Sequence, residues 1–122
     1  MAGYTDAIRQ RFMQPQYAHT ADAAADYQLS VGAVEQGALL QLFFMVDAQA
    51  QRVERATFKM YGCGVCIAFA DLLCERLTGM ALKDITTINT QQLAQDLSVP
   101  SAKMHCVWLA NEAVEAFLYD ND

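Results

Sequence analysis

The sequence is poor in basic residues and has no long apolar run. Lys and Arg together number 8, against 14 Asp and Glu, and the formal net charge is -6. The basic residues are scattered along the chain, which argues against a surface that neutralises phosphates and so against nucleic-acid binding. No apolar stretch approaches the roughly 20 residues that a membrane-spanning helix needs. We therefore expect no nucleic-acid partner and no membrane segment.

The start of the chain lacks a basic patch followed by an apolar segment, so the sequence predicts no signal peptide. We expect a cytoplasmic protein, in a compartment where disulfides are rare. The 4 cysteines then indicate thiol chemistry, metal binding or plain burial. An acidic surface suits docking onto basic partner proteins, although it also serves solubility alone.

The pattern of apolar residues predicts one α+β domain spanning residues 1–122. Hydrophobic residues make up 54% of the chain, enough to fill a single core. The predicted elements are a helix at 4–13, strands at 27–34, 39–47 and 52–61, and helices at 66–77, 90–97 and 103–119. Short connections between the strands favour a three-stranded antiparallel sheet. Because helices follow strands, we expect the helices to pack on one face of that small sheet.

Finer features of these elements can also be predicted. In the third strand Ala56, Phe58 and Met60 alternate with polar residues, which predicts one buried and one solvent-facing side. Residues 14–26 are polar and rich in alanine, so we expect a mobile connection with a solvated His19. Thr90 is the expected N-cap of its helix.

Cys63 lies between two glycines, where the third strand ends and a helix begins. Glycines permit a tight turn and close backbone approach. The positive end of the helix dipole favours the thiolate, which is the form that ligates metal or attacks sulfur. Because a cysteine between glycines has little packing around it, function is favoured over simple burial.

Three further residues are candidates for the same chemistry. His105 and Cys106 carry donors suited to zinc and iron, and the break at Pro100 gives the irregular helix start that lets neighbours reach one ion. Such a pair alone more often reflects packing than ligation. Cys66 completes a C-x-x-C spacing with Cys63, which suits one shared ion or a redox pair. It also falls on an apolar helix face, so burial and ligation are equally consistent. Cys74 is expected in the core.

Two separated segments carry a resemblance to a known family. They are Phe58-Lys59-Met60-Tyr61-Gly62-Cys63-Gly64 and Lys103-Met104-His105-Cys106. Both resemble the signature blocks of the IscU/NifU iron–sulfur cluster assembly scaffolds. The resemblance extends over nearly the whole chain, beginning with Ile8, Phe12 and Pro15.

The resemblance implies an α+β fold of the IscU/SufE type. It implies a scaffold that receives sulfur from a cysteine desulfurase, combines it with iron, and relays a labile cluster, of [2Fe-2S] type, to apo iron–sulfur client proteins. Cys63, His105 and Cys106 would bind the cluster at an exposed end of the domain. A monomer and a homodimer are both compatible with this role.

The sequence also departs from the family pattern. Where the family has Cys-Gly-Asp in its first hairpin, this chain has Gln36-Gly37-Ala38. The stretch 99–103 matches the family's chaperone-recognition motif only loosely, which leaves recruitment of that chaperone in doubt. Cys66 could replace the lost thiolate. Cys63, Cys66, His105 and Cys106 would then form a Cys₃His set suited to tetrahedral zinc or to one edge of a cluster.

Three functions follow from these observations. The first is a non-catalytic scaffold or carrier that binds iron or a cluster. The second is a zinc-containing persulfide transfer protein that partners a cysteine desulfurase, with Cys63 or Cys106 as the sulfur acceptor. The third is a degenerate relative that only docks onto assembly proteins and binds no metal.

Overall fold

The sheet has the predicted three antiparallel strands. The computed structural model describes residues 5–20 and 24–120. Its strands are β1 (Tyr27–Ala33), β2 (Ala38–Asp47) and β3 (Arg52–Tyr61), in the spatial order β1-β2-β3. β2 is central and mostly apolar on both faces, and Leu40, Leu42 and Phe44 are buried in the core.

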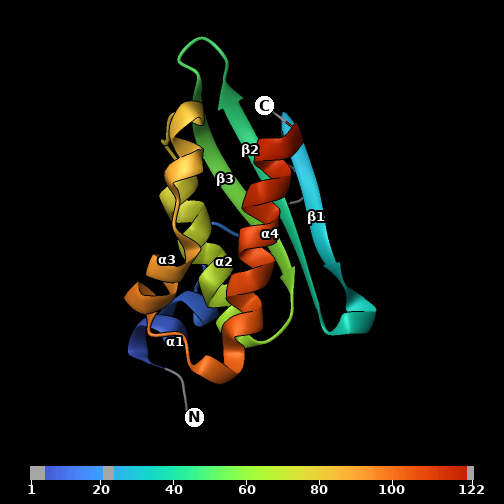
Figure 1. The fold of residues 1–122 in the computed structure, drawn as a ribbon, viewed down its shortest axis with the longest axis vertical. Helices are drawn as coiled ribbons and strands as arrows, with labels where there is room; N and C mark the ends of the chain where they lie inside the picture. The colour runs from blue at the N-terminus through green and yellow to red at the C-terminus, as the bar shows by residue number, and fades with distance from the viewer. Residues whose placement is uncertain (1–4, 21–23, 121–122) are drawn as a thin grey trace.

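Among the described residues, four α-helices accompany the sheet: α1 (Asp6–Met13), α2 (Gly64–Leu77), α3 (Thr90–Leu97) and α4 (Met104–Asp120). Helices α2 and α4 run side by side across one face, with α2 against β3 and α4 against β1 and β2 (Figure 1). Helix α3 packs against both of them, and α1 packs on α2. This arrangement confirms the predicted α+β class with helices on one face of a small sheet.

The helix ends depart slightly from the prediction. The predicted start of α1 at Tyr4 lies outside the described residues, and the first described helix turn is capped by Thr5, whose hydroxyl accepts from the amide of Ile8. Helix α3 is capped by the side chain of Asn89, so the prediction of Thr90 as the cap is wrong by one residue. Thr90 instead lies buried and bonds to Asn111.

Short 3₁₀ turns join these elements. They are η1 (Val34–Gln36) in the β1–β2 connection, η2 (Leu82–Thr87) before α3, and η3 (Ser101–Lys103) directly before α4. The turn η3 follows Pro100, which confirms an irregular entry into the last helix. No helix among the described residues has the length and apolar character that a membrane span requires.

The described part of segment 14–26 is ordered against the sheet, which corrects the prediction of a mobile connection. The amide of His19 donates to the carbonyl of Phe58, and the amide of Phe58 donates to the carbonyl of Tyr17. The His19 ring stacks on Phe43 at 3.8 Å between centroids and its Nδ1 lies 2.7 Å from the Thr57 hydroxyl. His19 is therefore not a freely solvated side chain. Thr57 is one of the polar residues of the third strand that were expected to face solvent, and it is 4% exposed.

A buried carboxylate anchors the same segment. Asp71 on α2 is 1% exposed. One of its oxygens accepts from the amides of Gln16 and Tyr17, both at 2.8 Å, and the other accepts from Arg11 at 2.9 Å. Burial of a charge is costly unless it is paired and hydrogen-bonded, and here every contact serves to hold the N-terminal residues onto α2.

Candidate metal centre

The first half of the site forms at the junction of β3 and α2. β3 ends at Tyr61, and Cys63 follows as the N-cap residue of α2, in an extended conformation with φ −76° and ψ 170°. Cys66 lies three residues further on, and side chains at this spacing share one side of a helix. The two Sγ atoms are accordingly 3.6 Å apart.

Gly62 leaves room for this arrangement. A Cβ added at Gly62 would lie 3.0 Å from the methyl of Met60 and 3.6 Å from Sγ of Cys66. The tight contact is with the flexible end of Met60, while the distance to Cys66 is an ordinary van der Waals contact. A small side chain at this position would therefore lie directly against Cys66.

The second half forms at the start of α4. His105 and Cys106 occupy the first turn of this helix, directly after η3. The Nε2 atom of His105 lies 3.6 Å from Sγ of Cys106 and 3.7 Å from Sγ of Cys66. Two adjacent residues thus reach the same point, as expected for the irregular helix start after Pro100.

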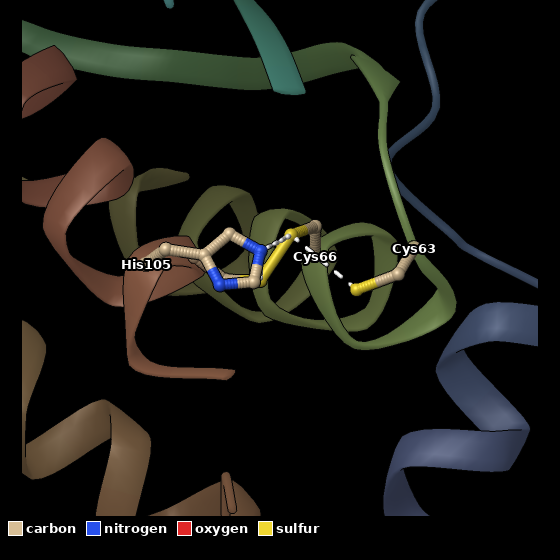
Figure 2. The surroundings of a disulfide bond; sticks show 4 residues. Cys63, Cys66 and His105 are labelled. Atoms are coloured by element: carbon tan, nitrogen blue, oxygen red, sulfur yellow. Dashed lines mark hydrogen bonds between the residues drawn. A yellow bond between two sulfur atoms is a disulfide. The ribbon is translucent and has the colours of Figure 1, made fainter. Parts of the chain in front are cut away.

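The structure brings all four predicted metal ligands together. Their donor atoms lie within 4.8 Å of one another, although they come from two helices and two distant parts of the chain. Figure 2 shows the His105 ring reaching across to the sulfurs from α4, while Cys63 approaches from the turn before α2. His105 is exposed and Cys63 is half-buried, whereas Cys66 and Cys106 are 2% and 4% exposed. The site is open on one side and closed by the core on the other.

A disulfide joins Cys66 to Cys106, and the sequence did not predict it. The S–S distance is 2.13 Å and the two Cα atoms are 5.0 Å apart. Cys63 and Cys74 are free thiols. The partners are 40 residues apart, so no local spacing could have revealed the pairing.

Three of the six separations between the donor atoms match those around a tetrahedral ion. With Zn–S near 2.3 Å and Zn–N near 2.0–2.1 Å, tetrahedral ligand atoms lie about 3.5–3.8 Å apart. The three separations of 3.6, 3.7 and 3.6 Å fall in that range. Cys66 and Cys106 are bonded, so their disulfide must be reduced before both can ligate. The residue types therefore fit zinc or iron in the reduced chain.

The first hairpin lacks the cysteine and the aspartate that the IscU/NifU resemblance would place there. Leu39 pairs with Tyr61, which places the β1–β2 connection at the same end of the molecule as Cys63. That connection reads Gln36-Gly37-Ala38, and Gly37 ends η1 with φ 91°. Neither a thiol nor a carboxylate stands at those three positions.

Cys74 is separate from this site, as predicted. It is fully buried in α2. Burial raises the pKa of the Cys74 thiol well above its usual value of 9.0, and the charge of Asp71 raises that pKa further. Cys74 therefore stays protonated and has no part in ligation.

The fold and the four donors together define a class: a small α+β domain with a cysteine–histidine cluster at one end. Over residues 3–121 the chain matches the NifU-like N terminal domain family, and it belongs to that family. This confirms the resemblance seen in the two signature segments.

Several named proteins are similar to this chain in sequence. The iron-sulfur cluster assembly scaffold protein IscU of Haemophilus influenzae is 39% identical over 90 residues, covering 74% of this chain and 71% of that protein. Iron-sulfur cluster assembly protein 1 of Arabidopsis thaliana is 37% identical over 90 residues, covering 74% of this chain and 54% of the relative. The mitochondrial iron sulfur cluster assembly protein 2 of Saccharomyces cerevisiae is 34% identical over 90 residues, covering 74% and 58%. The chain thus spans little more than half the length of the last two.

Solved structures share the fold. A candidate iron-sulfur cluster assembly scaffold protein for the SUF system from Fervidobacterium islandicum superposes with a TM-score of 0.71 at 13% identity, covering 93% of this chain and 94% of that chain. The N-terminal part of a NifU-like protein from Brucella abortus gives a TM-score of 0.59 at 12% identity, covering 94% and 79%. At these identities the likeness supports the fold alone.

Proposed function

We propose that this chain is a divergent iron–sulfur cluster assembly scaffold that binds iron or a labile cluster and relays it to client proteins. The observation that carries the proposal is the group of four donor atoms within 4.8 Å of one another. In the reduced chain these donors are three thiolates and an imidazole, which iron accepts. Membership of the NifU-like N terminal domain family supports the same role.

The openness of the site supports relay rather than permanent storage. His105 is exposed and Cys63 is half-buried, so a bound cluster would be accessible to a recipient. We propose a cysteine desulfurase as the sulfur source, apo iron–sulfur proteins as clients, and the cytoplasm as the compartment. The ligand set here is Cys63, Cys66, His105 and Cys106, with Cys66 in place of the thiolate that the hairpin lacks.

Anaerobic reconstitution tests this proposal. The protein is reduced, freed of metal, and mixed with ferrous iron and sulfide. We expect a brown protein with visible sulfur-to-iron absorbance, and Cys63→Ser and Cys66→Ser should each lose most of that absorbance. Cys74→Ser is the matched control, because Cys74 is a buried thiol away from the site. A colourless parent protein would refute the scaffold proposal.

A second candidate is a zinc-containing persulfide transfer protein. It is favoured by the three donor separations that match tetrahedral zinc and by the half-buried free thiol of Cys63. It predicts a colourless protein with about one zinc per chain that a cysteine desulfurase persulfidates on Cys63 or Cys106. Metal analysis of anaerobically purified protein separates the two candidates.

A further inference from the structure

Among the three cysteines of the site, Cys66 provides the central sulfur. Its Sγ is bonded to that of Cys106 and lies 3.6 Å from the Sγ of Cys63. Cys63 is the more accessible thiol, since it is half-buried while Cys66 and Cys106 are 2% and 4% exposed. An incoming sulfur donor therefore meets Cys63 first, with Cys66 directly behind it and Cys106 behind that.

We propose that Cys66 is a resolving thiol that releases sulfide from a persulfide carried on Cys63. This inference rests on the sulfur-accepting role in the proposed function, and it adds a source for the two electrons. A persulfide holds sulfur at the oxidation level of the element, and a cluster needs sulfide. The chain carries, beside the acceptor, two thiols that can supply that reduction.

The first step is an attack by the Cys66 thiolate on Sγ of Cys63, the sulfur that it already contacts. A Cys63–Cys66 disulfide forms, the bond from Cys63 to the outer sulfur breaks, and hydrosulfide leaves with the bonding pair. This is thiol–disulfide exchange with hydrosulfide as the leaving group. The proton that Cys66 loses on forming the thiolate is taken up by the hydrosulfide, which leaves as hydrogen sulfide.

The second step moves the disulfide inward. Cys106 attacks Sγ of Cys66, the Cys66–Cys106 bond forms, and Cys63 leaves as a thiol. In sum, one Cys63 persulfide and two thiols give one Cys63 thiol, one Cys66–Cys106 disulfide and one hydrogen sulfide. The product has the bonding found in the structure, with Cys63 free and Cys66 joined to Cys106. A dithiol reductant then restores the two ligand thiols.

A single-turnover experiment tests the resolving role. The full chain is reduced, freed of metal by a chelator, loaded briefly with glutathione persulfide without oxygen, and desalted. Sulfide is measured, and the protein is alkylated and mapped by mass spectrometry. The balanced reaction predicts about one sulfide per chain, a Cys66–Cys106 disulfide, and an alkylated Cys63.

Variants assign the steps. Cys66→Ser and Cys66→Ala should keep the persulfide on Cys63 and release about tenfold less sulfide; using both substitutions guards against a folding defect in one. Cys106→Ser should still release sulfide but stop at a Cys63–Cys66 disulfide. Cys74→Ser, the matched control, should behave like the parent protein.

Two outcomes would overturn the inference, and they differ in what else they overturn. If both Cys66 variants release sulfide as fast as the parent, Cys66 is not the resolving thiol. The scaffold proposal still stands in that case if the parent takes up iron and sulfide in the anaerobic reconstitution, because added sulfide bypasses the persulfide. If no variant holds a persulfide on Cys63, and the parent also stays colourless in the anaerobic reconstitution with iron and sulfide, the inference and the proposed function fail together.

Discussion

Cys66 combines two properties that the sequence presents as alternatives. It is 2% exposed within α2, as its apolar helix face predicts, and its sulfur nevertheless faces the other donors. Burial on the core side and ligand chemistry on the other are compatible because only the Sγ atom must reach the site. Packing and ligation therefore do not exclude each other at this position, and only the three-dimensional placement of α4 could reveal this.

His105 allows the ligand set to be tested by a clean comparison. Its Nε2 lies 3.6–3.7 Å from two sulfurs, so His105→Ala removes one of four donors and leaves the thiols in place. We expect the zinc affinity of the reduced protein to fall by roughly 100-fold. Removing a residue that only hydrogen-bonds to a metal ligand already costs about 10–100-fold, and losing a ligand should cost at least as much. The measurement is a competition titration with a chromophoric chelator.

The other histidine of the chain provides the control for that experiment. His19 stacks on Phe43, on the sheet and not at the cysteine cluster, so His19→Ala should leave zinc affinity within about twofold. Equal losses of affinity in the two variants would exclude His105 as a ligand.

Cys74 should give stability a specific dependence on pH. Its pKa is raised in the folded state by burial, and further by Asp71. Above about pH 9 the thiol ionises in the unfolded chain while it stays protonated in the folded one. The unfolded state then holds fewer protons, so the free energy of unfolding falls as pH rises, by up to about 1.4 kcal/mol per pH unit.

The comparison of the parent protein with Cys74→Ala isolates this effect. Urea unfolding between pH 8 and 10 should show a shallower alkaline loss in the variant. Iodoacetamide should leave Cys74 unmodified in the native reduced protein while it labels Cys63. Identical pH profiles for the two proteins would contradict the assignment.

At the scale of elements, local patterns predicted what local forces determine. Alternation in β3 and helical spacing in α2 and α4 gave the right kind of element within a few residues. The segment 14–20 was misjudged because its order comes from partners far along the chain, the carbonyl of Phe58 and the carboxylate of Asp71. Polar, alanine-rich residues carry no periodicity that would reveal such pairing. Asp71 was the one available clue, but the sequence alone does not distinguish a buried aspartate from one on the surface.

Asp71 should therefore determine whether the N-terminal residues stay in place. Asp71→Ala removes the acceptor for Arg11 and for the amides of Gln16 and Tyr17. Because breaking a buried pair leaves its partners uncompensated, we expect a loss of about 3 kcal/mol in the free energy of unfolding. Amide hydrogen exchange at residues 16 and 17 should become much faster.

Glu75 supplies the matched control for this prediction. It also pairs with Arg11, at 3.0 Å, but its side chain is 43% exposed. Glu75→Ala should cost less than about 1 kcal/mol, as exposed ion pairs do. A destabilisation by Asp71→Ala no larger than this would show that the anchor is unimportant.

At the scale of the whole molecule, the site is a product of chain topology. The donors come from the two helices that run side by side across the sheet, and both pairs lie at the N-terminal ends of those helices. Residue patterns alone could nominate Cys63, Cys66, His105 and Cys106 but could not bring them together. Their convergence was predictable only through resemblance to a family, which supplied the fold that periodicity cannot.

The disulfide should also stabilise the whole domain. It closes a loop of 40 residues, and the chain-entropy relation gives about 4 kcal/mol for a loop of that length. We expect thiol reduction in the presence of a chelator to shift the urea midpoint down, and added zinc to recover part of the shift by binding the folded state. A midpoint unaffected by reduction would mean that the bond contributes nothing to folding.

One further consequence follows from where that bond falls along the chain. It closes a covalent ring that contains most of α2, the whole of α3 and the first turn of α4. All three strands precede this ring in the chain and lie outside it. A protease that cuts the backbone once inside this ring leaves two fragments that the disulfide still joins covalently. Only a reducing environment would let them separate, so the oxidised chain survives a nick that would divide the reduced one.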